Sequence, residues 1–61
     1  MEPLAVSVEE AARLLGISRS KMYLLLNDGR IDSLRIDTAR RIPMDSIRSF
    51  VERNRIAADG S

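Results

Sequence analysis

Residues 7–30, SVEEAARLLGISRSKMYLLLNDGR, carry the signals of two short amphipathic helices joined by a tight turn. Ser7 can cap the first helix, and Glu10 has the capping-box spacing to reach back to the Ser7 amide. Gly16 can end this helix, because glycine adopts a left-handed conformation without a steric penalty from a Cβ atom. We therefore predict a first helix over about residues 8–15.

The second helix is predicted over about residues 19–28, with Ser18 as its cap and Gly29 as its stop. In both helices, apolar residues recur at the spacing that places them on one buried face. These are Ala11, Ala12, Leu14 and Leu15 in the first helix and Met22, Leu25 and Leu26 in the second. Two helices that cross at a tight glycine-containing turn form a helix-turn-helix, whose exposed second helix fits the major groove of B-DNA.

The side chains opposite the buried stripe of the second helix are the candidates to contact DNA. They are Arg19, Ser20, Tyr23 and Asn27, with Lys21 and Leu24 on the flanks and Ser18 at the cap. Tyr23 could be a half-buried ring at the edge of a thin core, a phenol that donates to a phosphate, or both. Leu24 could be an ordinary exposed leucine, or it could contact a thymine methyl group or a neighbouring subunit.

From residue 31 onward the pattern changes to the alternation of a short β-hairpin with a turn at residues 37–39. Leu34, Ile36 and Ile42 are expected to face the core, Arg35 and Arg41 to face outward, and Arg40 to share the side of Ile42 nearer the tip. A hairpin with arginines near its tip, following a helix-turn-helix, is a wing that can contact the minor groove or phosphates. The alternative is an edge hairpin that its charges protect from aggregation. The preceding motif favours the wing.

A third helix is predicted to begin after Pro43, with Asp45 as an acid in its first turn. Its apolar face is formed by Met44, Ile47, Phe50 and Val51. Phe50 is the single phenylalanine of the chain, so we expect it to fill the centre of the core.

These elements predict one α+β, mostly helical domain over residues 1–61, a winged helix-turn-helix in the order α-α-β-β-α. Before the first helix, a short lead-in can place Leu4 or Val6 on the core. The domain is expected to have its core over about residues 5–55, followed by a tail at 56–61.

The composition narrows the range of functions. The 61 residues include no cysteine and no histidine. The chain therefore has no disulfide and no thiolate or imidazole metal site, and it lacks the commonest general base. No nucleophile–base arrangement is visible either, so we expect no metal, no cofactor and no catalytic activity. There is no apolar run of the roughly 20 residues that a membrane span needs and no signal-peptide pattern, so we expect a cytoplasmic protein without a membrane partner.

The formal net charge is only +1, but the charges are unevenly distributed. Residues 1–10 carry three acids and no base, whereas residues 13–41 carry seven bases and three acids. Positive charge is thus concentrated where the helix-turn-helix and hairpin lie, as an electrostatic footprint on DNA requires. The alternative is a solvated face of mixed charge.

Three stretches within residues 6–52 together resemble the MerR-like winged helix-turn-helix of the excisionase family. They are VSVEEAARLLGISRSKMYLLLNDGRI, then LRI, then RRIPMDSIRSFVE. The resemblance implies a protein that places its second helix in the major groove of double-stranded DNA and its wing on the minor groove or backbone. Stand-alone members of this length resemble phage excisionases, including those of mycobacteriophages.

Such excisionases are recombination directionality factors. The resemblance therefore implies cooperative binding of several copies to an attachment site in the bacterial host cell, bending of that site, and a bias of the integrase toward excision. Whether that integrase is of the tyrosine or the serine type stays open. The chain departs from the family at Leu24 and Asn27, where arginines are common. It also departs at the wing tip, where the family often has glycine and arginines and this chain has Asp37-Thr38-Ala39, and at Arg40, where an aromatic residue is common.

Two other functions stay open from the sequence. One is a small phage or bacterial transcription regulator on the same fold. The other is a protein-interaction module that uses Leu24 and the third helix and never binds DNA.

Overall fold

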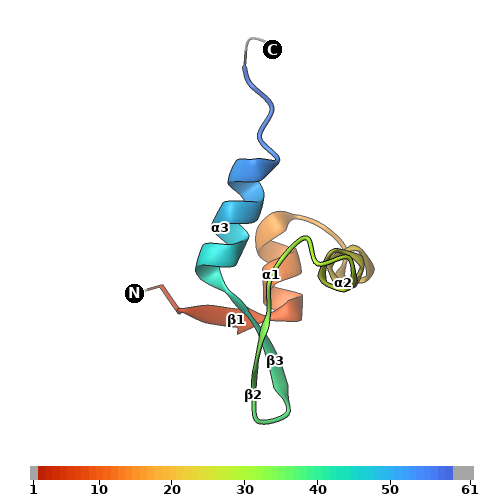
Figure 1. Ribbon diagram of the computed structural model, residues 1–61, viewed down its shortest axis with the longest axis vertical. Helices are drawn as coiled ribbons and strands as arrows, with labels where there is room; N and C mark the ends of the chain where they lie inside the picture. The colour runs from red at the N-terminus through yellow and green to blue at the C-terminus, as the bar shows by residue number, and fades with distance from the viewer. Residues whose placement is uncertain (1, 59–61) are drawn as a thin grey trace.

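The computed structural model describes residues 2–58, which form three helices and a small antiparallel sheet (Figure 1). In chain order the elements are β1 (Ala5–Ser7), α1 (Val8–Leu15), α2 (Arg19–Asn27), β2 (Leu34–Ile36), β3 (Ala39–Pro43) and α3 (Met44–Arg53). The predicted α+β winged helix-turn-helix is confirmed, with α1 at its predicted bounds and one strand more than expected. Residues 56–58 have no helix or strand, and the rest of the predicted tail, 59–61, lies outside the described residues.

The ends of α1 follow the local signals in the sequence. The Ser7 hydroxyl accepts a hydrogen bond of 3.1 Å from the Glu10 amide, which confirms Ser7 as the N-cap. The return half of the capping box is absent among the described residues, because the Glu10 carboxylate instead accepts hydrogen bonds from Arg13 one turn along the helix. At the other end Gly16 has φ 70°, the left-handed conformation expected of it.

A single apolar cluster joins all three helices and the sheet. Its buried members are Val6, Val8, Ala11, Ala12, Met22, Leu25, Leu26, Ile31, Ile42 and Ile47. Met22 of α2 and Ile42 of β3 are fully buried, so these two side chains form its centre. The stripe predicted for α2 is therefore confirmed.

Three expectations about the core residues of the helices are wrong. Leu14 of α1 and Val51 of α3 are exposed and do not belong to the apolar cluster. Phe50 is only partly buried and packs against the outside of the cluster rather than filling its centre. The centre of this thin core is instead at Met22 of α2 and Ile42 of β3.

The segment before α1 is a strand, which the sequence did not predict. β1 pairs antiparallel with β3, with Val6 opposite Ile42, and gives a sheet in the order β1-β3-β2. Val6 is buried and Leu4 is exposed, so Val6 is the lead-in residue that packs on the core. The Leu4 carbonyl accepts a hydrogen bond of 2.8 Å from the Met44 amide, which fastens the start of the chain to the start of α3.

The hairpin of β2 and β3, called the wing from here on, projects from the base of the molecule in Figure 1. Its register pairs Leu34 with Arg41, Arg35 with Arg40 and Ile36 with Ala39. This leaves a two-residue turn, Asp37-Thr38, in which Asp37 has φ 56°. Aspartate tolerates that left-handed conformation better than most residues do.

This register corrects the predicted faces of the wing. Directly paired residues point to the same side of a sheet, and neighbours along a strand alternate. Leu34 therefore lies on the side of Arg41, opposite Ile42, and so does Ile36. The two side chains are 39% and 58% exposed, so they do not face the core as expected. Arg35 is exposed as predicted, but it lies on the same side as Arg40 and not on that of Arg41.

Candidate nucleic-acid interface

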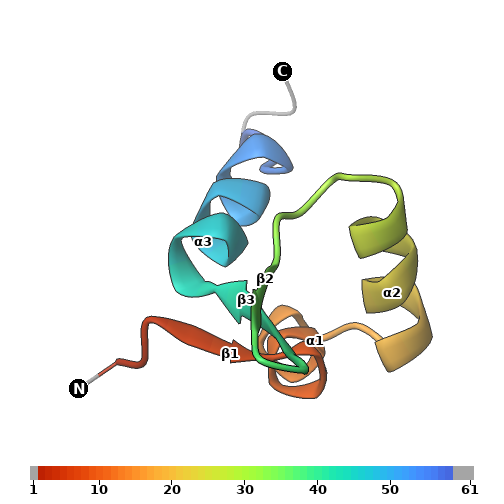
Figure 2. The same cartoon turned by 60° about the horizontal axis from the view of Figure 1, so that its bottom comes forward.

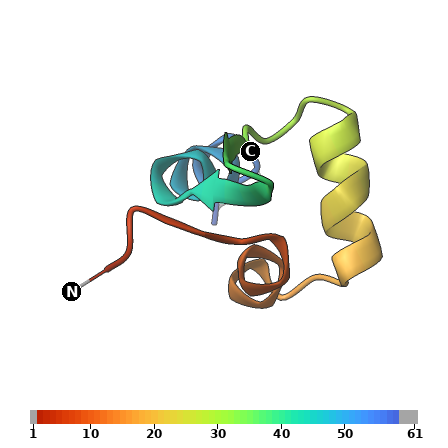
Figure 3. The ribbon, with the colours of Figure 1, turned by 90° about the horizontal axis from the view of Figure 1, so that it is seen from below.

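The second helix of the helix-turn-helix stands at one side of the molecule, away from α3 (Figures 2 and 3). Its stripe of Met22, Leu25 and Leu26 packs inward, and this leaves the opposite face to solvent. The exposed residues on that face and at its start are Ser18, Arg19, Ser20, Lys21, Leu24 and Asn27. The candidates predicted for this helix are thus collected on one surface, with Tyr23 at its border.

The start of α2 is fixed by its cap. The Ser18 hydroxyl accepts a hydrogen bond of 3.1 Å from the Lys21 amide. The Ser18 side chain is therefore already used within the protein, and its first role is to define where α2 begins. The end of α2 is fixed by Gly29 at φ 71°, after which the Arg30 amide donates to the Leu25 carbonyl at 3.0 Å.

Arg19, the first residue of α2, is held by two other side chains. Its Nε lies 2.9 Å from Oε2 of Glu9 on α1, and its guanidinium carbon lies 5.5 Å from the centre of the Tyr23 ring. Polar interaction with the Tyr23 side chain and then the charge of Glu9 raise the pKa of Arg19, so the guanidinium is charged at any physiological pH.

Tyr23 occupies the first of the two positions that the sequence left open, a half-buried ring at the edge of the core. The side chain is half-buried and packs against the apolar cluster, while its ring also lies beside the Arg19 guanidinium. The contribution of its hydroxyl to DNA binding stays a prediction.

On α1, the ion pair between Glu10 and Arg13 is confined to the helix itself. The hydrogen bond from Arg13 lowers the pKa of the Glu10 carboxyl, and the same contact raises the pKa of Arg13. Both side chains are exposed, so the pair adds little to stability. It does not contact α2, which sets it apart from the Glu9–Arg19 pair.

The wing carries three arginines, and two of them are oriented by hydrogen bonds within the wing or to the residue just before it. The Arg40 Nε donates to the Ser33 hydroxyl at 3.0 Å, and the Arg41 Nη1 donates to the Arg40 carbonyl at 3.0 Å. Arg35 is exposed beside Arg40 on the neighbouring strand. The wing thus presents Arg35 and Arg40 on one face and Arg41 on the other.

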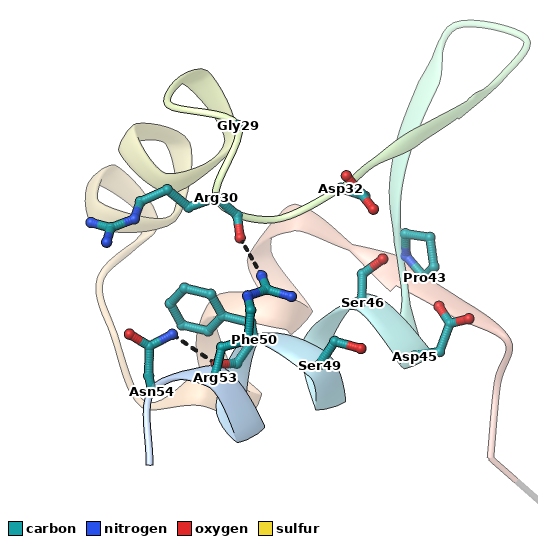
Figure 4. A pocket seen from close by; sticks show the side chains of 10 residues that line it. All are labelled: Gly29, Arg30, Asp32, Pro43, Asp45, Ser46, Ser49, Phe50, Arg53 and Asn54. Carbon is teal, nitrogen blue, oxygen red and sulfur yellow. Dashed lines mark hydrogen bonds between the residues drawn. The ribbon is translucent and has the colours of Figure 1, made fainter. Parts of the chain in front are cut away.

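An open polar groove of about 880 Å³ lies between α3 and the segment that leads from α2 to β2 (Figure 4). At one end of it the Arg53 Nη2 donates to the Arg30 carbonyl at 2.8 Å, which ties the end of α3 to the chain just after α2. Arg53 is thus a structural residue that the sequence did not single out. Among residues 2–58 no group of three or more acidic, cysteine or histidine side chains could hold a metal ion. Within the same range no helix has the length and apolar character to cross a membrane.

Sequence reasoning missed Glu9 and Ser33, the two side chains that hold candidate DNA-contacting arginines. Glu9 had only a helix-start signal, because its partner lies ten residues on and the angle between α1 and α2 sets their contact. Ser33 lies seven residues before Arg40, and only the hairpin register brings the two together.

An exposed second helix and an arginine-bearing hairpin define a winged helix-turn-helix, a class of DNA-binding domain. Residues 5–55 match the family described as "Helix-turn-helix domain". Over 50 residues the chain is 40% identical to a protein named "Excisionase" from Streptomyces ambofaciens, covering 82% of this chain and 81% of that protein. The chain belongs to the excisionase family of helix-turn-helix proteins.

A second relative agrees with this assignment. A protein named "Probable excisionase" from Saccharopolyspora erythraea is 46% identical over 48 residues, which cover 79% of this chain. The chain spans about half of the length of that relative, 49%. No solved structure matches the chain significantly. The predicted excisionase family is thus confirmed. The MerR-like subtype of the fold and the mycobacteriophage origin stay predictions.

Proposed function

We propose that this protein is a recombination directionality factor, which binds and bends attachment-site DNA and favours excision by an integrase. The observation that carries the proposal is the outer face of α2, which is exposed and largely polar in a chain whose relatives are named excisionases. The protein would act by binding alone, without a cofactor and without catalysis, on DNA in the bacterial cytoplasm.

In this proposal α2 enters the major groove and reads base edges with Arg19, Ser20, Lys21 and Asn27. Side chains near the start of a recognition helix are the ones that reach base edges in helix-turn-helix proteins. An arginine can donate to both acceptors of a guanine, and an asparagine can pair with an adenine. Ser18 and Tyr23, at the border of that surface, would contact phosphates.

The wing would contact the backbone or the minor groove through Arg35, Arg40 and Arg41. Arginine is favoured in a narrow minor groove because the negative potential is stronger there. The orientation of Arg40 by Ser33 supports this role, since an ordered side chain loses less freedom on binding.

The contact area supports a need for several copies. A single module of this size buries about 600–1,000 Å² of protein surface on DNA, which is small. Net charge +1 adds little general attraction to DNA. We therefore propose that copies load side by side and that the assembled copies meet the integrase, whose type stays open.

The test is a footprint of the purified protein on the DNA that flanks its gene, followed by an excision reaction with the neighbouring integrase. Protection of tandem repeats beside an attachment site, a bend seen by circular permutation, and faster excision are the expected results. Protection over a promoter with no effect on excision would make the protein a transcription regulator instead. No binding even to random duplex at low salt would make it a protein-interaction module.

A further inference from the structure

The observation behind this inference is a contact that joins the two helices of the helix-turn-helix. Oε2 of Glu9, in the first turn of α1, lies 2.9 Å from Nε of Arg19, the first residue of α2. The ring of Tyr23, one turn along α2, lies 5.5 Å from the carbon of the same guanidinium. Arg19 is therefore held from both helices.

We propose that Glu9 is a positioning residue for DNA recognition, which fixes the orientation of Arg19 before DNA arrives. The inference rests on the proposed function, in which α2 reads base edges. The ion pair uses Nε, the guanidinium nitrogen nearest to the backbone. The two terminal nitrogens, Nη1 and Nη2, are still donors in the fork that can meet a guanine.

A purely stabilising role explains the contact poorly. The Arg19 and Glu9 side chains are 64% and 57% exposed, and exposed pairs contribute little to stability. A carboxylate beside a DNA-binding surface also repels phosphates, so on its own it would weaken binding. Its presence is accounted for if it holds Arg19 in the orientation that binding requires.

The size of the expected effect follows from side-chain ordering. Immobilising a long side chain at an interface opposes binding by an amount equivalent to about two- to tenfold in affinity. Arg19 held by Glu9 has lost part of that freedom already. Releasing it should therefore lower the preference for the specific site by a factor in this range.

The experiment compares Glu9→Gln with Glu10→Gln, its matched control. Both changes remove one negative charge from the first turn of α1, but Glu10 contacts Arg13 and not α2. Dissociation constants are measured on the wild-type footprint sequence and on a random duplex of equal length, at one salt concentration. Urea unfolding of each variant verifies that the fold is intact.

We expect both variants to bind random duplex slightly more tightly than the wild type does, and by the same factor. Only Glu9→Gln should lower the ratio of specific to random affinity, by about two- to tenfold. In an Arg19→Ala background, Glu9→Gln should leave the ratio unchanged. Glu9→Asp retracts the carboxylate without changing the charge, so it should lower the ratio while random binding stays at the wild-type level.

Equal ratios for Glu9→Gln and Glu10→Gln would overturn the proposal and reduce Glu9 to a surface charge. A ratio that rises in Glu9→Gln would also overturn it, because Glu9 would then be withholding Arg19 from DNA. If the wild-type protein binds every tested duplex no better than random DNA, the proposed function itself is overturned, which is a different result.

Discussion

Met22 lies at the centre of the core, on the helix that packs against α1. It is one of the two largest fully buried side chains, and it belongs to the same helix that presents the candidate DNA-contacting face. Its packing therefore helps to hold the exposed side chains of α2 in place.

We expect Met22→Ala to lower the free energy of unfolding by about 2–5 kcal/mol, because it leaves a cavity that short helices cannot fill. A domain of this size is only marginally stable, so the variant should be largely unfolded. The measurement is urea denaturation followed by circular dichroism. Leu24→Ala, at an exposed position on the same helix, is the matched control and should change stability by no more than about 0.5 kcal/mol. Similar midpoints for the two variants would contradict the packing described here.

Arg19 and Ser20 are the residues expected to determine sequence selectivity. Arg19→Ala and Ser20→Ala should each weaken binding to the specific site by about 1–3 kcal/mol, the worth of one good base contact, and affect random duplex much less. The measurement is the ratio of the two dissociation constants. Arg55→Ala, which removes an exposed arginine beyond the end of α3, should leave the ratio unchanged. Unchanged ratios for both α2 variants would show that α2 does not read the sequence.

For single residues, the sequence predicted most of the contacts that are made within a few positions along the chain. Ser7, Gly16 and Ser18 act within a few residues of themselves, so a short window contains their whole signal. The contact between Glu9 and Arg19 depends on the angle between two helices, which no local pattern specifies.

Among the elements, the wing shows how a small difference in a turn changes a surface. A three-residue turn at 37–39 would pair Ile36 with Arg40 and Leu34 with Ile42, which is the basis of the predicted faces. The observed turn has two residues, so the register moves by one and Leu34 and Ile36 move to the outer face. A shift of one residue always exchanges the two faces of a strand. The alternating pattern predicted the hairpin but could not distinguish these two turns.

We expect the wing to act on DNA through charge. Arg40→Ala and Arg41→Ala should weaken binding to all sequences by similar factors, and each lost phosphate contact should lower the salt slope by about 1. The measurement is the dissociation constant of the double variant on random duplex across a range of salt concentrations.

The matched control removes two arginines from the other end of the molecule. Arg48 and Arg55 form exposed ion pairs with Glu2 and Glu52, so replacing both with alanine gives the same change in net charge. An unchanged slope in the wing variant, or an equal change in the control, would make the wing a structural hairpin.

On the scale of the whole molecule, the wing lies at one end of the long axis, and α3 runs from the sheet toward the other end (Figure 1). A copy bound through α2 and the wing would thus direct α3 away from the wing tip. Adjacent copies on tandem sites would then contact one another through exposed apolar residues at and after the end of α3, such as Val51 and Ile56.

We expect weak self-association in free solution and cooperative loading on DNA that carries several sites. Each neighbour adds a protein contact and so raises the effective affinity without a new base contact. The measurement is titration onto duplexes with one, two and three sites, where affinity per site should rise with the number of sites. The same affinity per site on all three would exclude cooperativity and favour a monomeric regulator.

The pairing of β1 with β3 supports the wing at one end only. At its root, Arg41 lies between Ser7 of β1 and Leu34 of β2, whereas Ala39 and Arg40 extend beyond β1 and pair with β2 alone. The root of the wing is therefore braced by a strand on each side, whereas its tip has a single neighbouring strand. β1 thus connects the wing to Ser7, the cap of α1, so a change in the first residues of the chain is expected to affect the wing as well.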